Sequence, residues 1–545
     1  PFQDELTRSV RPVLLVMLAS AGLLLLVSCG NVAALLLGAG IDREQELAVR
    51  GAIGASRRRL AQQLLTESTL IALAGAGGGI ALAGLTTRAL TFLAPPGVPR
   101  IAEVSVDGPV LAFAVGLSAL CGLLFGLVPA LSLSSTDLSD AMGSSRTAGG
   151  RRARLQSTVV VGELALATVL IFGGLLLGRT VSALNQVDPG FEHERLVVLS
   201  MALSSQRFDT GDDEADAAAF RAYEREIIEE VAALPQVEAV HSSTAPPFFG
   251  WRGNNAVLPE GWADPDNAPV AERRLVSAGF HEFMGIPLLE GRELTAADFL
   301  EGAEPVVVVS RGLAELAWPG ESALGRTLDH WTQGARVVGV AGDIHDERLG
   351  GATEIAYYAP KAPFVGPGAP LVMRVSGDPD QVIPAIRERI WSVDADIPIT
   401  RVATMRELMR DQLSGQIYRA RLMTVFAALA GIFALLGIYG VTSRSVARRT
   451  REMGLRVALG ADRGRVRGLV TLQAVRMAVF GVAIGVAIAM AVAGVVEGFL
   501  WGVTRTDPVT LLVVGLGLPL LSALAALPPA RRATRVDPMV ALKAD

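Results

Sequence analysis

The apolar residues of this chain gather in long runs toward both ends, whereas the middle of the chain mixes apolar and polar residues. Long apolar runs alternate with short polar connections, and each run approaches the roughly 20 residues that a helix needs to cross a bilayer. Seven such runs lie at 13–38, 68–93, 109–131, 156–178, 420–443, 469–496 and 509–527. We expect each of them to form a transmembrane helix, in a helical bundle of seven spans.

The segment between the fourth and fifth runs has a different pattern. Residues 216–234 carry charged and apolar positions at helical spacing up to Pro235, and a second helical pattern covers 379–393. Short β-rich runs bounded by Gly, Pro and Asp lie at Val306–Ser310, Arg336–Ala341, Leu371–Val375 and Ile397–Val402. We expect an α+β domain that is large enough to bury its own core and that divides into two subdomains in the loop-rich stretch Pro246–Ala271.

An internal repeat links the two ends. The block Glu46-Leu-Ala-Val-Arg50-Gly-Ala-Ile-Gly54-Ala55 returns 406 residues later as Glu452-Met-Gly-Leu-Arg456-Val-Ala-Leu-Gly460-Ala461. Both copies stand between two apolar runs, so the repeat indicates a duplicated domain. The expected organisation is a three-helix domain (1–143), a basic linker (144–155), one helix (156–183), the α+β domain (184–417) and a second three-helix domain (418–545).

The positions of the arginines predict the orientation. Short loops rich in Lys and Arg stay in the cytoplasm, and arginines crowd the loops at 43–59, 146–154 and 444–467. The connections at 94–108 and 497–508 hold one arginine each. We therefore expect these two connections and the α+β domain on the extracytoplasmic side of the membrane.

This orientation places Pro1 outside. By comparison with the second half, we expect a further helix and a further external domain before it in the intact protein, which would then have eight spans. An N-terminus that starts outside is the alternative.

Composition agrees with a membrane protein. Apolar residues make up 51% of the chain, the mean hydropathy is +0.42, and the net charge is −5. The basic loops follow from the orientation and do not indicate nucleic-acid binding. Cys29 and Cys121 both lie in expected spans, so no disulfide framework is available to the external domain.

Several phrases in the sequence resemble one family. They are the repeated block, Phe283-Met-Gly-Ile-Pro287 followed by Gly291-Arg292, Trp318-Pro-Gly-Glu-Ser-Ala-Leu-Gly-Arg326 and Val337-Val-Gly-Val-Ala-Gly-Asp343. Together they resemble the MacB/FtsX-type ABC permeases, and the duplication is similar to that of the tandem acidobacterial-type permeases. The resemblance implies a multi-pass mechanotransmitter in the bacterial inner membrane, in which a cytoplasmic ABC ATPase dimer drives motion of the helices and of the external domains.

We expect no enzyme and no cofactor in this chain itself. Its sequence has no GxxxxGK[ST] motif, and the nearest phrase, Gly320 to Thr327, has Arg326 in place of the phosphate-binding lysine. The resemblance therefore implies that ATP and Mg²⁺ bind a separate ATPase subunit. No HExxH, CxxC or GxSxG motif occurs, and Asp343-x-His345-Asp346 is expected to be an ordinary surface turn rather than a metal site.

The repeated block is the candidate for coupling to that ATPase. Glu46 and Arg50, and in the second copy Glu452 and Arg456, stand at i and i+4, a spacing that stabilises a helix by about 0.2–0.5 kcal/mol. Glycine then ends or bends each helix. The coupling candidates are Glu46, Arg50, Gly54, Ala55, Arg59, Glu452, Arg456, Gly460, Ala461 and Arg465. The alternative is an interfacial helix whose arginines meet lipid headgroups.

Two further patterns lie inside the expected spans. Gly75 and Gly79 form a GxxxG motif that recurs as Gly481 and Gly485, and such motifs let helices approach closely. Glu163 and Arg476 are ionisable groups inside apolar runs, which is costly. They either pair across two spans or extend toward the inner interface.

Two classes of function are compatible with this reading. The first is ATP-driven export or extraction of a drug, a peptide or a lipoprotein, which implies an ABC ATPase, membrane lipid and a periplasmic adaptor or outer-membrane channel as partners. The second is an FtsX-like transducer that controls an extracytoplasmic partner. A membrane enzyme has no catalytic constellation to support it.

Overall fold

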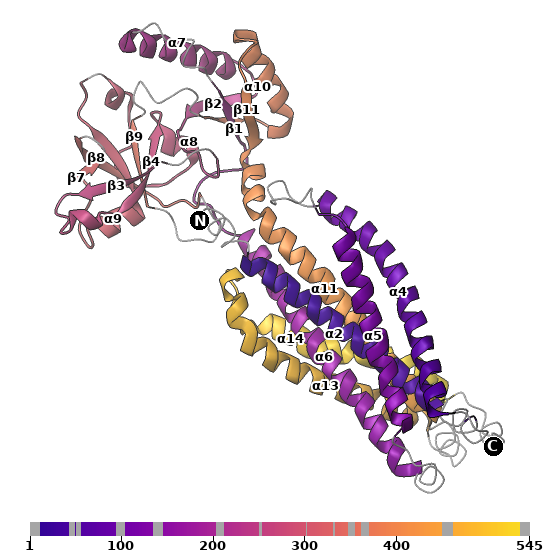
Figure 1. Ribbon diagram of the computed structural model, residues 1–545. Coiled ribbons are helices and arrows are strands. Elements are labelled where there is room, and N and C mark those ends of the chain that lie inside the picture. Colours follow the sequence, from indigo (N-terminus) through magenta and orange to yellow (C-terminus); the bar gives the residue numbers. More distant parts are fainter. Residues whose placement is uncertain are drawn as a thin grey trace. The chain divides into compact units, whose positions relative to one another are not determined.

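The computed structural model describes residues 11–42, 50, 56–93, 104–134, 145–202, 212–249, 253–300, 302–330, 333–346, 355–360, 370–448 and 462–534. The chain folds as two compact units. One is a helical unit formed by Pro1–Ala183 and Gly415–Asp545, and the other is an α+β unit formed by Leu184–Ser414. Figure 1 shows long helices in the first unit and both sheets in the second.

The helical unit contains seven long helices among the residues that the structure describes. They are α2 (Arg11–Asp42), α4 (Arg57–Leu93), α5 (Gly108–Ser134), α6 (Ser145–Leu184), α11 (Met405–Arg448), α13 (Arg463–Val496) and α14 (Pro508–Ala533). Local sequence explains the start of α14. Pro508 supplies the fixed φ that suits a first helical position, and Asp507 accepts a hydrogen bond from the Thr510 N–H at 2.7 Å.

Six of these helices are long and apolar enough to cross a membrane, as judged by length and composition. The apolar segments are Leu14–Ala34, Leu65–Ala89, Gln156–Leu184, Met405–Arg448, Arg463–Gly494 and Pro508–Arg532. A shorter apolar segment, Gly108–Leu120, lies in α5. The chain thus has the multi-pass helical character that its apolar runs predict.

Helix α6 forms the centre of the helical unit. Its buried side chains Val160, Leu164 and Leu170 pack with small residues of α11 and α13, such as Ala434 and Ala474. Large apolar side chains point outward instead, for example on α4 and α14, as expected for a surface that faces lipid. The core of this unit is therefore built from close approach of helix backbones.

The α+β unit contains a four-stranded antiparallel sheet in the order β11-β1-β10-β2. Its strands are β1 (Leu196–Met201), β2 (Val237–Ser242), β10 (Leu371–Val375) and β11 (Ile399–Thr404). Helix α7 (Asp213–Ala232) joins β1 to β2, and helix α10 (Pro379–Val393) joins β10 to β11. This connection order and strand order are those of a ferredoxin-like βαββαβ fold.

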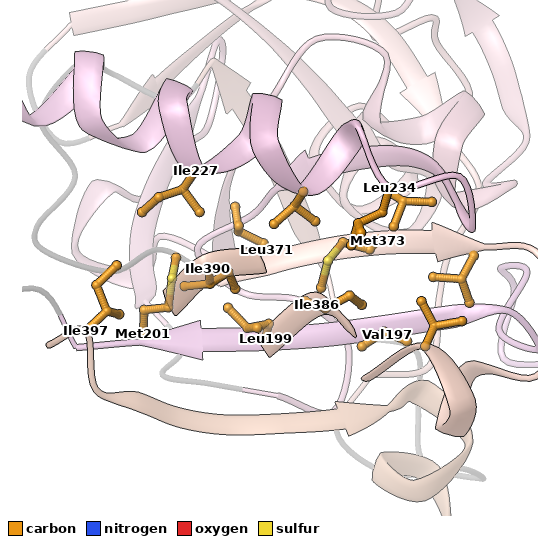
Figure 2. Packing of buried hydrophobic residues seen from close by; sticks show 14 residues of the cluster. Val197, Leu199, Met201, Ile227, Leu234, Leu371, Met373, Ile386, Ile390 and Ile397 are labelled. Carbon is orange, nitrogen blue, oxygen red and sulfur yellow. The ribbon is translucent and has the colours of Figure 1, made fainter. Parts of the chain in front are cut away.

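Both helices cover the same face of this sheet. Ile227 of α7 and Ile386 of α10 are fully buried in one cluster with alternate residues of β1, such as Leu199. Figure 2 shows these side chains between the helices and the strands. Alternation of side chains along a strand directs residues 197, 199 and 201 to this face.

A seven-stranded sheet is inserted between β2 and β10, in the order β5-β8-β6-β9-β4-β3-β7. Its strands are β3 (Gly253–Pro259), β4 (Val270–Val276), β5 (Leu288–Gly291), β6 (Val306–Ser310), β7 (Thr327–His330), β8 (Gln333–Ala341) and β9 (Ala356–Pro360). Strand β7 pairs with β8 as well as with β3. That additional pairing closes the sheet on itself around a core that includes Val309, Val337 and Tyr357. Two short helices, α8 (Phe280–Met284) and α9 (Arg311–Ala317), belong to the same insertion.

The expected division of this unit is confirmed in part. The two sheets separate between β2 and β3, where residues 246–249 of the expected stretch lie, and again between β9 and β10. The rest of Pro246–Ala271 is not a linker throughout, because it contains β3 and the first residues of β4. The sequence Gly253–Pro259 has few β-branched residues, so its pairing to β4 and β7 was not evident from pattern alone.

We predict that Ile227→Ala lowers the free energy of unfolding of the α+β unit by about 2–5 kcal/mol, because it leaves a cavity under α7. The control is Glu226→Ala on the exposed side of the same helix, for which we expect a change within about 0.5 kcal/mol. Thermal and urea unfolding of the purified protein measure both. Equal effects of the two variants would show that α7 does not pack as described.

Candidate functional site

The repeated block is partly described by the structure. Glu46, Gly54, Ala55, Glu452, Arg456, Gly460 and Ala461 lie outside the described residues. Arg50 is described, and its Nη1 donates a hydrogen bond to Gln63 Oε1 of α4 at 3.2 Å. Gln63 in turn donates to Glu67 Oε1 at 3.1 Å. The first copy of the block is therefore bonded to the first turns of α4.

The helices that follow the two copies begin at equivalent positions. Helix α4 begins at Arg57 and α13 at Arg463, which are 406 residues apart, the same shift as in the repeat. Arg59 and Arg465 occupy the same place in the first turn of each helix, and both side chains are exposed. Each copy thus presents a basic first turn of a long helix.

The two glycine pairs have different surroundings. A Cβ added at Gly481 would lie 2.5 Å from Leu164 Cβ, and one added at Gly485 would lie 2.5 Å from the Ala165 carbonyl oxygen. Helix α13 therefore contacts α6 along this glycine face. In the first copy, no atom of the described residues outside the local helix lies within 4 Å of a Cβ added at Gly75 or Gly79.

The structure does not bring Glu163 and Arg476 together, which corrects the expectation of an ion pair. Glu163 is only 3% exposed, whereas the Arg476 side chain is exposed on α13. Glu163 points instead toward α2 and α11, where it lies against the backbone at Gly30 and Gly437. Glu163 also does not extend toward an interface, because its carboxyl group is buried.

In the α+β unit, the family phrase that ends at Arg292 forms a capped turn. The Arg292 guanidinium donates two hydrogen bonds to the Asp298 carboxylate, at 2.7 and 2.8 Å. Asp298 also accepts from the Thr295 N–H at 2.7 Å. The Arg292 hydrogen bonds, followed by those from Thr295, lower the pKa of Asp298 to about 2.

The Asp343-x-His345-Asp346 segment is not a surface turn. Asp346 is 2% exposed and accepts a hydrogen bond from the buried Arg274, which also bonds Glu272 Oε2 at 2.7 Å. Asp343 Oδ1 accepts from the Gly312 N–H at 2.8 Å, at the start of α9. These carboxylates neutralise a buried arginine and satisfy a helix start.

Across the described residues, no group of three or more His, Cys, Asp or Glu side chains could hold a metal ion. Burial lowers the pKa of His241, whose Nδ1 lies 2.9 Å from Ser277 Oγ and whose ring stacks on Phe283. Arg374 covers the same Phe283 ring at 5.5 Å from its centre. This stack joins α8 to the four-stranded sheet and is a packing feature.

Comparison with protein families assigns most of the chain. The FtsX-like permease C-terminal family matches residues 18–138 and again 424–538. The MacB-like periplasmic core domain family matches residues 157–393. The matches reproduce the order of the helical segments and of the α+β unit along the chain.

Two curated relatives are named MacB, like the core-domain family that matches this chain. The macrolide export ATP-binding/permease protein MacB of Hahella chejuensis is 24% identical over 435 residues, which cover 75% of this chain and 63% of that protein. MacB 1/2 of Paracoccus denitrificans is 29% identical over 220 residues, or 38% of this chain and 32% of that protein. The chain thus spans less than two thirds of the length of either relative.

A solved structure, the periplasmic region of MacB from Actinobacillus actinomycetemcomitans, is similar at 13% sequence identity. The match covers 40% of this chain and 92% of the solved chain. Its TM-score of 0.29 is too low to carry an argument. The assignment therefore depends on the family matches. They define a membrane permease with a MacB-type core domain between two permease domains. The chain belongs to the MacB/FtsX-type family of ABC transporter permeases.

Sequence reasoning missed the surroundings of Glu163. Asn31 donates from Nδ2 to the Phe433 carbonyl oxygen of α11 at 2.8 Å, beside Gly30 and Gly437. A signal was present, because Asn31 and Gly437 are 406 residues apart and hence equivalent in the repeat. Two isolated residues in apolar runs have no motif of their own, so the equivalence alone did not indicate a contact.

We predict that Gly485→Ala destabilises the protein more than Gly79→Ala does. The added methyl group at 485 overlaps with α6, which corresponds to about 1–3 kcal/mol for overpacking. At 79 it meets open space and gains helix propensity. The thermal midpoints of the two variants in the same detergent measure the difference. Equal midpoints would contradict the close approach of α13 and α6.

We also predict that Asp298→Asn destabilises the α+β unit at neutral pH, by up to about 1 kcal/mol, since Arg292 is half exposed and solvent screens the pair. The pKa of Asp298 is lower in the folded state, so its contribution is complete above the unfolded value near 3.8 and is lost as the pH falls through about 2. Urea unfolding from about pH 5 down to about pH 2 measures this. A difference between wild type and variant that stays constant over this range would contradict the ion pair.

Proposed function

We propose that this chain is the membrane-spanning part of an ABC system that exports or extracts a substrate. The observation that carries the proposal is the order of family matches, in which a MacB-like core domain lies between two FtsX-like permease domains. A permease of this kind needs an energy source and a moving part. The helical unit would relay motion to the α+β unit, which lies on the extracytoplasmic side of the inner membrane in this proposal.

The energy source would be a cytoplasmic ABC ATPase dimer that binds ATP and Mg²⁺. The relatives in the comparison are named ATP-binding/permease proteins, whereas the 545-residue sequence of this chain contains no GxxxxGK[ST] motif. We therefore assign ATP hydrolysis to a partner subunit. The substrate would be of the drug, peptide or lipoprotein class, and a periplasmic adaptor or outer-membrane channel would receive it.

The repeated block would dock this ATPase once per copy. Arg59 and Arg465 support this proposal, because both are exposed in the first turns of helices that begin 406 residues apart. Two equivalent basic elements on one chain suit a dimeric partner, which has two equivalent surfaces. An interfacial role at lipid headgroups is compatible with the same charges.

We predict that the double variant Arg50→Glu, Arg456→Glu retains about tenfold less ATPase on co-purification, a loss of about 1.4 kcal/mol in binding. Reversed charges would repel the surface that the arginines contact. The measurement is the amount of candidate ABC ATPase retained by the tagged permease, together with the rate of ATP turnover.

The matched control is Arg505→Glu, which follows α13 at the end opposite to Arg465. It should retain the ATPase, and all variants should keep the thermal midpoint of the wild type. Unchanged binding in the double variant would move the docking surface elsewhere. If even the wild-type chain retains no ABC ATPase, the proposed transport function fails. ATPase binding with transfer of motion to a soluble hydrolase, and no substrate movement in vesicles, would favour the FtsX-like transducer.

A further inference from the structure

The carboxyl group of Glu163 is inserted between α2 and α11. A Cβ added at Gly30 of α2 would lie 2.6 Å from Glu163 Oε1, and one added at Gly437 of α11 would lie 2.5 Å from Oε2. Both distances are far below van der Waals contact, so a larger residue at either position would displace the Glu163 carboxyl group from this place. The two glycines thus form a notch that the end of Glu163 fills.

Nothing in the described part of the chain neutralises this carboxyl group. Glu163 is 3% exposed, and neither of its oxygens has a hydrogen-bond partner among the described residues. None of the ion pairs of the described residues includes Glu163. A charged carboxylate buried without a partner in an apolar helix bundle is strongly unfavourable. The group therefore requires a bound positive charge or a bound proton.

The neighbouring polar atom is an acceptor. Asn31 donates from Nδ2 to the Phe433 carbonyl oxygen at 2.8 Å, which, among the described residues, leaves its Oδ1 as the free acceptor on the Gly437 side. A Cβ at Gly437 would lie 2.8 Å from this Oδ1 as well as 2.5 Å from Glu163 Oε2. Two acceptor oxygens therefore converge on one place, and neither can donate to the other unless one carries a proton.

The charged groups on the neighbouring helices are directed elsewhere. Arg444 of α11 lines a cavity of about 230 Å³ next to Asn31 and Gly437, and its Nη1 donates to the Ala34 carbonyl oxygen at 2.9 Å. Gln156 of α6 is uncharged and donates to the same oxygen at 3.4 Å. On α13, Arg476 is exposed. Among the described residues, these contacts leave the Glu163 carboxyl group without a counter-charge at contact distance.

A metal ion fits this place less well than a proton does. Hard divalent cations take about six or more oxygen ligands. Among the described residues, the side-chain oxygens nearest to a Cβ added at Gly30 or Gly437 are the two of Glu163 and the one of Asn31. A proton needs a single donor and a single acceptor.

We propose that the helical unit holds a proton at this site, with Glu163 as a neutral carboxylic acid whose O–H donates to Asn31 Oδ1 after a small rotation of the carboxyl group. Asn31 and Gly437 are equivalent positions in the repeat, so the proton lies where the two copies meet. Release of the proton leaves a bare carboxylate in the glycine notch and drives α6 away from α2 and α11. Proton occupancy thereby controls how the two copies pack.

Infrared spectroscopy of the full chain in detergent at neutral pH tests this proposal and needs no ATPase. We expect the wild type to show the C=O stretch of a protonated carboxylic acid, with a shift on exchange into D₂O. The band should be lost in Glu163→Gln and kept in the matched control Glu497→Gln, whose carboxyl group is exposed. A wild type without this band overturns the proposal.

Two further variants keep the test valid if Glu163→Gln fails to fold. Asn31→Leu removes the acceptor and should move the band to higher frequency without removing it. Asn31→Asp should lower the thermal midpoint, because a second carboxyl group then faces Glu163. A metal cation at the site would raise the thermal midpoint of the wild type in sodium but not in choline, and the carboxylic-acid band would be absent. That result would also overturn the proposal.

Discussion

Close approach of helix backbones at glycine is the constraint on which the membrane part of this protein depends. Between helices surrounded by lipid there is no strong hydrophobic driving force, so contact distance decides which helices associate. Helix α6 meets α13 at Gly481 and Gly485, and it meets α11 at Gly174, where an added Cβ would lie 3.2 Å from Ala427 Cβ. The same helix inserts Glu163 between α2 and α11 at two further glycines. One helix thereby contacts both copies of the repeat.

The same sequence motif has different structural surroundings in the two copies of the repeat. The GxxxG glycines of α13 face α6, whereas those of α4 have no neighbour within 4 Å outside the helix among the described residues. Likewise Asn31 in one copy stands where the other has Gly437. The duplicated sequence therefore builds a site to which each copy contributes a different residue. Because the two equivalent positions carry different residues, Asn31 and Gly437, one carboxyl group from α6 fits between the two copies.

Patterns local to the sequence predicted much of the fold. Val306–Ser310 and Leu371–Val375 were located to the residue, because each is a buried β-branched or apolar run bounded by turn residues. Helix 379–393 was predicted with the same bounds, and Asp378 caps it by accepting from the Asp380 N–H. The family, and hence the permease role, followed from motifs that the family matches confirm.

What could not be predicted depends on contacts between distant residues. Asp346 was expected at the surface, but Arg274, 72 residues earlier, draws it into the core. The strand Gly253–Pro259 carries two asparagines and a terminal proline, and only its pairing with β4 and β7 makes it a strand. Glu163 was expected either to pair with Arg476 or to extend toward the inner interface, whereas the structure buries it against two glycines. Local periodicity contains none of this information.

The insertion of the seven-stranded sheet has a consequence for how such proteins diversify. Ser242, the last residue of β2, pairs directly with Leu371, the first residue of β10. The chain therefore leaves the ferredoxin-like part and returns to it at adjacent points, across a single strand pair. A segment attached in this way can be lengthened, shortened or exchanged as a cassette while the four-stranded part stays intact. Related chains can thus change the inserted sheet without rebuilding the four-stranded part that continues into their helices.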